Sequence, residues 1–153
     1  AFILGQVSQG IEPIWSNSYV KDIAKIKTTI KNPFLVDLLE EKGQNTTEVW
    51  RSIRDYDGSV QHLDFLSENE KDVFKTYPEI DQNVIVYQAA NRQNHIDQGQ
   101  SINVMVHPDM PIKDVNNIYI TAWKLGVKSM YYQHSMNAAQ KFKQKKSCDS
   151  CEG

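Results

Sequence analysis

The two cysteines of the 153-residue chain, Cys148 and Cys151, stand close to its C-terminal end in the sequence KKSCDSCEG. A CxxC pair is typical either of a redox dithiol or of half a zinc site, and structural zinc takes four ligands. The sequence has no second CxxC, and its four histidines are scattered, which disfavours zinc. Two interpretations stay open: a redox dithiol, or two solvated thiols without a function.

The sequence around the cysteines favours the redox interpretation. Four lysines lie between positions 141 and 146, and nearby positive charge favours the thiolate, which is the form that attacks disulfides. The segment 134–153 has almost no large apolar side chains, which predicts a flexible tail. The position of the CxxC excludes a thioredoxin fold. A dithiol on a flexible tail suits the delivery of electrons to a site elsewhere.

Two further groups of residues have types that suit chemistry. Tyr131 and Tyr132 are adjacent at the end of a predicted strand. Neighbouring strand residues point to opposite faces, so a packing role predicts one ring in the core and one outside it. The sequence NHIDQGQSINV at 94–104 crowds polar groups before an apolar strand, and alone it predicts a turn whose amides bond backbone groups. Its polar members are Asp97, Gln98, Gln100 and Asn103.

Helix start and stop signals recur along the first half of the chain. Asn32 as N-cap and Pro33 as first residue predict a helix that ends before Gly43. Two capping-box pairs predict further helices, one that stops at position 58 and one that a proline at 78 interrupts. The pairs are Asn45 with Glu48, and Ser67 with Glu70.

Other segments carry weaker signals. A helix is predicted at about 81–92, and an extended segment at 26–30. Imperfect alternation of Val60, Leu63 and Phe65 predicts a second extended segment at 58–66.

The last third of the sequence predicts a strand, a helix and a second strand with short connections. The strands are 101–106 and 127–133, and apolar residues recur at helical spacing from Ile112 until Gly126. Parallel strands joined in this way form a right-handed crossover and are buried beneath their helix. The predicted fold class is therefore α/β, and two such strands are too few for a complete sheet.

Composition and charge exclude several classes of protein. A net charge of -2, with Lys and Arg spread among Asp and Glu, offers no basic face for nucleic acid. No stretch approaches the roughly 20 apolar residues that span a bilayer, and the N-terminal sequence lacks the features of a signal peptide. We therefore expect a cytoplasmic protein that binds neither nucleic acid nor membranes. The start on an apolar run without methionine favours an excised or incomplete polypeptide.

Three of these pieces, in this order, resemble a known family. IDQGQSIN, AWKLGVKSMYYQ and the tail with its cysteine pair are similar to the C-terminal end of the large (alpha) subunit of class I ribonucleotide reductase. The resemblance covers the whole chain: ILGQVSQGIEPIWSNSY is similar to the segment after the family's substrate-phosphate loop, and KNPFLVDLLEEKG and DGSVQ follow in family order. Glu12 and Pro13 match a motif beside the catalytic centre, where we expect a structural role.

The resemblance implies a fold and an activity. Residues 1–133 would form the C-terminal part of a ten-stranded α/β barrel, and residues 134–153 a flexible redox-active tail. The family reduces ribonucleoside diphosphates to deoxyribonucleotides, the precursors for DNA replication, by a radical mechanism. The radical comes from a small (beta) subunit that carries a dinuclear metal.

The resemblance also assigns roles to four residues. Tyr131 and Tyr132 match the stacked tyrosines that relay the radical to the active-site cysteine. Cys148 and Cys151 match the tail dithiol that re-reduces the active-site disulfide after each turnover and is itself reduced by thioredoxin or glutaredoxin. Two thiols on a flexible tail would then visit both a buried disulfide and an external reductant.

Several parts of the family's large subunit have no counterpart in this sequence. They include the active-site cysteines, the phosphate loop and the allosteric nucleotide sites, so we expect the N-terminal part of the subunit to supply them. This segment is then expected to bind no cofactor and no metal, and the ATP or dNTP effectors bind the missing part. A stand-alone dithiol carrier is the alternative, but it leaves the tyrosine pair unexplained. A module that binds a partner chain is another, and it overlaps with the first hypothesis if the gene is split.

Overall fold

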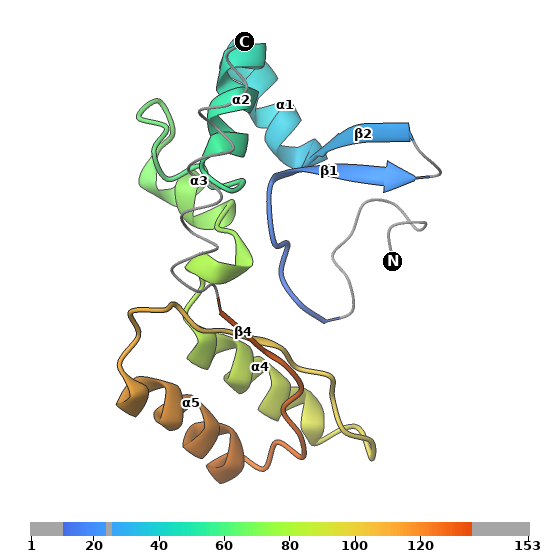
Figure 1. The fold of residues 1–153 in the computed structure, drawn as a ribbon, viewed down its shortest axis with the longest axis vertical. Helices are drawn as coiled ribbons and strands as arrows, with labels where there is room; N and C mark the ends of the chain where they lie inside the picture. Colours follow the sequence, from blue (N-terminus) through green and yellow to red (C-terminus); the bar gives the residue numbers. More distant parts are fainter. Residues whose placement is uncertain (1–10, 24–25, 136–153) are drawn as a thin grey trace. The chain divides into compact units, whose positions relative to one another are not determined.

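The structure, a computed structural model, describes residues 11–23 and 26–135, with the side chains of 21–27 left out. The chain divides into two compact units, Ala1–Glu79 and Ile80–Gly153 (Figure 1). The first unit contains β1 (Ser18–Ile23), β2 (Ile26–Lys31), α1 (Pro33–Glu41), α2 (Thr47–Asp55), α3 (Glu68–Val73) and the 3-10 helix η2 (Tyr77–Glu79). The second contains α4 (Gln82–Gln93), β3 (Val104–Met105), α5 (Ile112–Lys124) and β4 (Gln133–His134).

Strands β1 and β2 form an antiparallel hairpin in which Ser18 pairs with Lys31. The extended segment predicted at 26–30 is confirmed as part of β2. Its partner β1 carries no sequence signal, because SYVKDI lacks a regular apolar alternation. The backbone N–H of Asn32 donates to the Asn17 carbonyl at 2.9 Å, which joins the start of the hairpin to the start of α1.

The first predicted helix is confirmed as α1. The Asn32 side chain caps it by accepting the N–H of Phe34 at 3.2 Å, and Pro33 is its first residue. Gly43 follows the C-terminal end with a φ of 65°, a conformation that an L side chain rarely adopts.

The predicted N-cap of α2 is wrong by one position. The hydroxyl of Thr46, not the Asn45 side chain, accepts the N–H of Val49 at 3.3 Å. Asn45 bonds two other side chains: its Oδ1 accepts the indole N–H of Trp50 at 2.6 Å, and its Nδ2 donates to Glu40 at 3.0 Å. Asn45 thus fixes a buried indole, and threonine takes the cap. The helix also ends short of its predicted stop.

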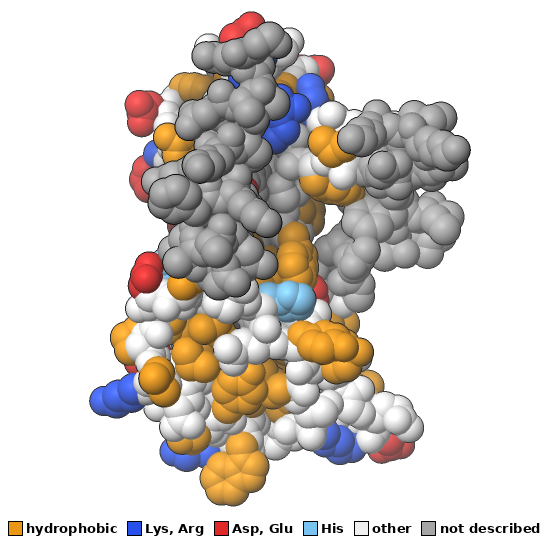
Figure 2. Space-filling model, in the orientation of Figure 1, with side chains coloured by type: hydrophobic (Ala, Val, Ile, Leu, Met, Phe, Trp, Pro, Cys, Tyr) orange, Lys and Arg blue, Asp and Glu red, His pale blue; other side chains and the backbone are white. Residues whose placement is uncertain are grey.

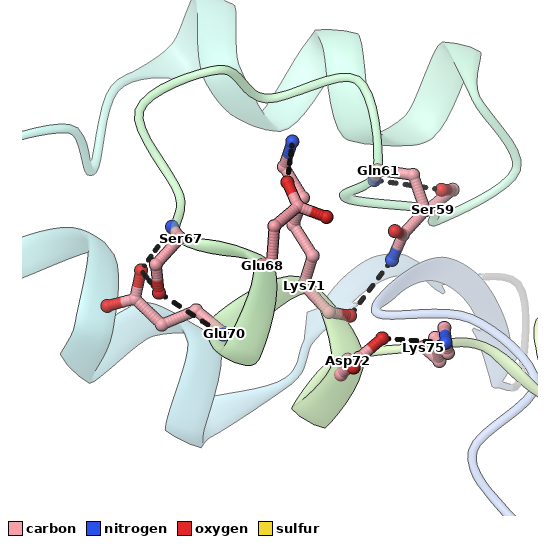
Figure 3. A network of polar contacts seen from close by, with 8 residues as sticks. All are labelled: Ser59, Gln61, Ser67, Glu68, Glu70, Lys71, Asp72 and Lys75. Atoms are coloured by element: carbon pink, nitrogen blue, oxygen red, sulfur yellow. Dashed lines mark hydrogen bonds and ion pairs between the residues drawn. The ribbon is translucent and has the colours of Figure 1, made fainter.

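The capping box predicted for Ser67 and Glu70 is confirmed at the start of α3 (Figure 3). Glu70 Oε2 accepts the backbone N–H of Ser67 at 2.7 Å, and Ser67 Oγ accepts the backbone N–H of Glu70 at 3.3 Å. The Gln61 side chain donates to the Lys71 carbonyl at 2.9 Å and so ties the preceding loop to the helix. The helix ends before Pro78, which lies in η2.

The extended segment predicted at 58–66 is wrong. Its residues form successive turns, in which the N–H of Leu63 donates to Val60 at 3.0 Å and that of Leu66 donates to Leu63 at 3.2 Å. Such turns place every third side chain on one side, so these three residues are buried while Phe65 stays 36% exposed. They complete the core of the first unit, which consists of Leu35, Leu39, Trp50, Ile53, Val60, Leu63 and Leu66.

In the second unit, β3 and β4 pair in parallel and α5 connects them (Figure 1). The predicted order of strand, helix and parallel strand is thereby confirmed. Helix α5 buries Ile118 and Ala122, and α4 lies against it. The core of this unit consists of Val86, Val104, Val106, Ile118 and Ala122.

The strands of this crossover are shorter than the sequence predicts. Strands were expected over 101–106 and 127–133, but regular pairing is limited to Val104–Met105 and Gln133–His134. The ladder is interrupted just before β4, where the hydrogen bonds change register. Within the described parts of the chain, no helix is both long and apolar enough to cross a membrane.

Candidate functional site

Tyr131 and Tyr132 lie directly before β4, and their rings contact each other. The ring centroids are 4.1 Å apart and the planes are inclined by 59°. The two side chains are 60% and 58% exposed. A packing role predicts one ring in the core and one outside it, and for this pair that prediction is wrong.

The backbone hydrogen bonds show how adjacent residues come to lie on one side. In a regular parallel ladder, one residue both donates its N–H to the neighbouring strand and accepts an N–H from it. Here the N–H of Tyr131 donates to the Ile102 carbonyl at 2.8 Å, whereas the carbonyl of Tyr132 accepts the N–H of Val104 at 2.9 Å. Two residues therefore oppose one on the β3 side, which is the arrangement of a β-bulge. The bulge breaks the alternation that would send the two rings to opposite faces.

The phenols of the pair interact as well as the rings. A hydrogen bond with Tyr132, and to a smaller extent burial, raises the pKa of Tyr131 above its usual value of 10.0. An interaction that raises the pKa of a phenol stabilises its neutral form, so Tyr131 keeps its proton at neutral pH. The rings of Tyr132 and His134 also lie edge to face, with their centroids 6.2 Å apart. The site thus brings two oxidisable rings into contact and places an imidazole ring beside them.

The polar segment at 94–104 supports the chain that leads to this pair. As predicted, its amides bond backbone groups: the side chain of Gln100, buried at 7% exposed, donates to the Ala89 carbonyl at 2.7 Å. Arg92 Nε donates to Gln100 Oε1 at 3.0 Å. The Ser129 hydroxyl donates to the Gln100 carbonyl at 3.2 Å and so fastens the segment before the tyrosines.

Ser52 and His62 form a pair that sequence analysis did not single out. The Ser52 hydroxyl and His62 Nε2 share a hydrogen bond, and the His62 ring stacks on Tyr56 with centroids 4.0 Å apart. Burial lowers the pKa of His62, so the ring is neutral at neutral pH. Its Nδ1 is buried without a hydrogen-bond partner, whereas a serine nucleophile needs a base that a third group orients. The pair is therefore structural, and two residues 10 positions apart give no sequence signal.

Glu12 belongs to a second cluster in the first unit. It is 8% exposed, and its carboxylate accepts the indole N–H of Trp15 at 3.0 Å. The Trp15 ring meets the fully buried Tyr77 ring edge-on at 5.9 Å. Burial, together with the nearby Glu12 carboxylate, raises the pKa of Tyr77 far above its usual range. These contacts are those of a packed cluster, which supports the structural role expected for Glu12.

The cysteine pair is not placed by the structure. Cys148 and Cys151 lie outside the described residues, and their role in the tail stays a prediction. In the parts of the chain that are described, no three His, Cys, Asp or Glu side chains are grouped so that they could hold a metal ion.

Helix α5 exposes large apolar side chains. Ile112 is 87% exposed and Trp123 is 78% exposed, at the two ends of the helix. Figure 2 shows further apolar side chains over the α4 and α5 part of the face in view. A contiguous exposed apolar surface is typical of a region that another chain or segment covers.

Comparison with known proteins gives the family. Residues 1–133 match the family model described as ribonucleotide reductase, barrel domain. The chain is 43% identical over 138 residues to the ribonucleoside-diphosphate reductase large subunit of Invertebrate iridescent virus 3, which covers 88% of this chain and 22% of that protein. It is 38% identical over 162 residues to the putative ribonucleoside-diphosphate reductase large subunit of Frog virus 3, which covers 100% of this chain and 28% of that protein.

A solved structure agrees with this assignment. The alpha subunit of the Actinobacillus ureae class Id ribonucleotide reductase matches with a TM-score of 0.80 and 55% sequence identity, over 91% of this chain and 25% of that one. The chain thus spans about a quarter of the length of these relatives, and the predicted α/β barrel fold is confirmed for a part of the barrel. This chain belongs to the ribonucleotide reductase family and is a portion of its barrel domain.

Proposed function

We propose that this chain is part of a ribonucleoside-diphosphate reductase large subunit and acts in the reduction of ribonucleoside diphosphates to deoxyribonucleotides. The family match over residues 1–133 supports the activity. The observation that carries the mechanism is the pair Tyr131–Tyr132, whose rings are in contact yet exposed. Within this proposal, the rest of the large subunit supplies the active site, the effector sites and the remaining barrel strands.

In the proposed relay, Tyr131 and Tyr132 transfer a radical between the protein surface and the active site. A tyrosine is oxidised when its phenol loses one electron and its proton. In the proposed direction, an oxidised Tyr132 takes the hydrogen atom of the Tyr131 phenol, to which it is hydrogen-bonded, and becomes a neutral phenol again. The radical then resides on Tyr131, which recovers a hydrogen atom from a cysteine thiol in the rest of the subunit. Contact between the rings makes the transfer short and direct.

The tail completes the cycle in this proposal. Substrate reduction leaves a disulfide in the active site, and the dithiol Cys148–Cys151 reduces it by thiol–disulfide exchange. The electrons and protons pass to the active-site cysteines, and the tail itself becomes the disulfide. Thioredoxin or glutaredoxin then reduces the tail. The lysines between positions 141 and 146 favour the thiolate that starts this exchange.

The proposed partners follow from the same scheme. A small (beta) subunit with a dinuclear metal supplies the radical, and it must approach the exposed face of the tyrosine pair. The apolar side chains on α5 suit contact with another chain or with the rest of the subunit. We further propose that the protein acts in the cytoplasm, which suits the substrates and reductants of this scheme.

The proposed role of the tyrosine pair is tested by replacing one tyrosine at a time with phenylalanine in the complete large subunit. Phe keeps the ring of Tyr131 or Tyr132 and its contact area, but it has no phenolic proton and is much harder to oxidise. Each Tyr→Phe variant, assembled with the radical-bearing partner, should form deoxynucleotide only at background rate. Nucleotide binding and melting temperature should stay nearly unchanged, because Phe keeps the ring and removes only the phenolic oxygen. Substantial turnover in both variants would refute the relay.

The tail is tested by Cys148→Ser and Cys151→Ser in the same complete enzyme. Turnover driven by thioredoxin should be lost in each variant. A small dithiol that reaches the active-site disulfide directly should still support turnover, because the radical chemistry is intact. Equal thioredoxin-driven rates in wild type and variants would refute the assignment of the tail. A matched control is Ser147→Ala, which changes the neighbouring residue and leaves both thiols in place.

A further inference from the structure

The bulge at the tyrosine pair displaces one hydrogen-bond donor from the ladder. In a regular ladder, the N–H of Tyr132 would donate to the Ile102 carbonyl, just before β3. Here the N–H of Tyr131 makes that bond. The displaced N–H of Tyr132 donates instead to Oδ1 of Asn103, at 3.2 Å. Asn103 is the residue directly opposite the bulge, because it lies between the two partners of the ladder, Ile102 and Val104.

Asn103 is well placed to hold this N–H in one direction. The side chains of its neighbours Ile102 and Val104 are each 1% exposed, so the backbone on both sides of Asn103 is fixed by buried groups. The Asn103 side chain therefore extends from a rigid element to the extra residue of the facing strand. A water molecule would also accept the N–H of Tyr132, but it would leave the direction of the peptide free.

The direction of this peptide controls the ring contact. The peptide N–H of Tyr132 belongs to the bond between Tyr131 and Tyr132, so its rotation turns the two side chains relative to each other. The ladder bonds at Tyr131 N–H and at the Tyr132 carbonyl fix the two outer ends of the pair. The bond to Asn103 fixes the middle, and the rings then lie 4.1 Å apart on one side.

We propose that Asn103 is a positioning residue for the Tyr131–Tyr132 pair, because its side-chain carbonyl replaces the ladder partner of Tyr132 and locks the bulge that stacks the two rings. This inference rests on the proposed relay function, and it adds a residue that touches neither the substrate nor the transferred hydrogen atom.

The test uses the complete large subunit with its radical-bearing partner. Asn103→Ala removes the acceptor, and Asn103→Asp restores an oxygen at the same position. Misplacement of reacting groups by about 1 Å lowers rates by about 100-fold, so we expect kcat of the Ala variant to fall by about 10- to 100-fold. The KM for the nucleotide should not change, and the Asp variant should recover most of the wild-type kcat. Asn117→Ala, at an exposed position of α5, is the matched control and should behave as wild type.

A spectroscopic readout separates positioning from simple loss of folding. Replacing Tyr131 with 3-aminotyrosine, which is oxidised more easily, traps the radical there, and its electron paramagnetic resonance signal gives the yield for each Asn103 variant. The yield per folded subunit should fall in the Ala variant and recover in the Asp variant. A yield that follows only the folded fraction would overturn the proposal.

Two further outcomes are distinguishable. If Asn103→Ala keeps full kcat while both Tyr→Phe variants are inactive, the positioning role is refuted and the relay stands. If both Tyr→Phe variants are active, the relay itself fails. Should the Ala variant not fold, amide hydrogen exchange in the unmodified subunit decides: the Tyr132 amide must exchange slowly, and fast exchange overturns the proposal.

Discussion

Tyrosines in two regions of this molecule have raised pKa values for different reasons. Tyr77 is fully buried, and burial together with the Glu12 carboxylate raises the pKa of its phenol. Tyr131 is 60% exposed, and its pKa is raised chiefly by the hydrogen bond with Tyr132. A pKa shift in the same direction thus arises from burial in one region and from a partner phenol in the other.

The two regions also differ in how their rings are surrounded. The Tyr77 region, formed by segment 12–17 with Gly58 and Tyr77, is closed by buried polar bonds. The N–H of Tyr77 donates to Ile14 at 2.9 Å, and the Asn17 side chain donates to Gly58 at 2.9 Å. In the tyrosine pair, hydrogen bonds hold the backbone in place while the rings are exposed. A ring that is held in place without being buried is a better sign of function than a ring held by burial.

The largest expected effect on stability comes from truncating Tyr77. Tyr77→Ala should lower the free energy of unfolding by about 3–5 kcal/mol, because it removes a fully buried ring and leaves a cavity. Tyr131→Ala should cost less, because this ring is 60% exposed in this part of the subunit and has fewer contacts to lose. Denaturant unfolding of the complete subunit, followed by a probe in the barrel, measures both. Similar losses in the two variants would remove the distinction between the regions.

A glycine pair tests how tightly the Tyr77 region is closed. Gly58 has a φ of 88°, and an added Cβ would meet Ser16 Oγ and would lie 2.8 Å from the Asn17 nitrogen. Gly43 has a φ of 65°, but nothing lies within 4 Å of an added Cβ. Gly43→Ala should therefore destabilise by about 1 kcal/mol through backbone strain alone. Gly58→Ala should cost about 2–4 kcal/mol, because overpacking adds to the strain. Equal melting temperatures for the two variants would contradict this account.

The smallest expected effect is a change in one titration. Tyr132→Phe removes the hydrogen-bond partner that stabilises the neutral phenol, so the pKa of Tyr131 should fall towards its usual value of about 10. The pKa of Tyr77 should stay high in the same variant, because burial raises it. Fluorine NMR of 3-fluorotyrosine-labelled subunit, titrated with and without the substitution, measures the difference. An unchanged Tyr131 titration would show that the pair shares no phenol hydrogen bond.

Local sequence signals predicted a large part of this fold. The caps of α1 and α3 and the order of strand, helix and strand follow from residues close together in the chain, because a cap bond spans two or three positions. The adjacent tyrosines were also visible as a candidate site. Their roles came from family resemblance, since packing alone predicted that one ring would be buried.

What the sequence could not predict depends on distant partners. The bulge arises from the register of hydrogen bonds between Tyr131, Tyr132 and β3, and Tyr132 and Asn103 are 29 positions apart. Likewise, Asn45 is not the cap of α2 because Trp50 competes for its side chain. The turns at 58–66 bury Val60, Leu63 and Leu66, which are spaced by three. The alternation of Val60, Leu63 and Phe65 in the sequence predicts a strand instead, because it includes the exposed Phe65 and omits Leu66.

The parallel pairing of β3 with β4 has a consequence for the order of folding. Hairpin β1–β2 closes a very short loop, whereas Val104 pairs with Gln133 across a segment that contains the whole of α5. Closing a longer loop has a larger entropic cost, so contacts of this kind form late. We therefore expect the bulge that stacks the two tyrosines to form late in folding, so that partly folded chains lack the stacked pair. An incompletely assembled subunit would then be unable to accept a radical that it could not use.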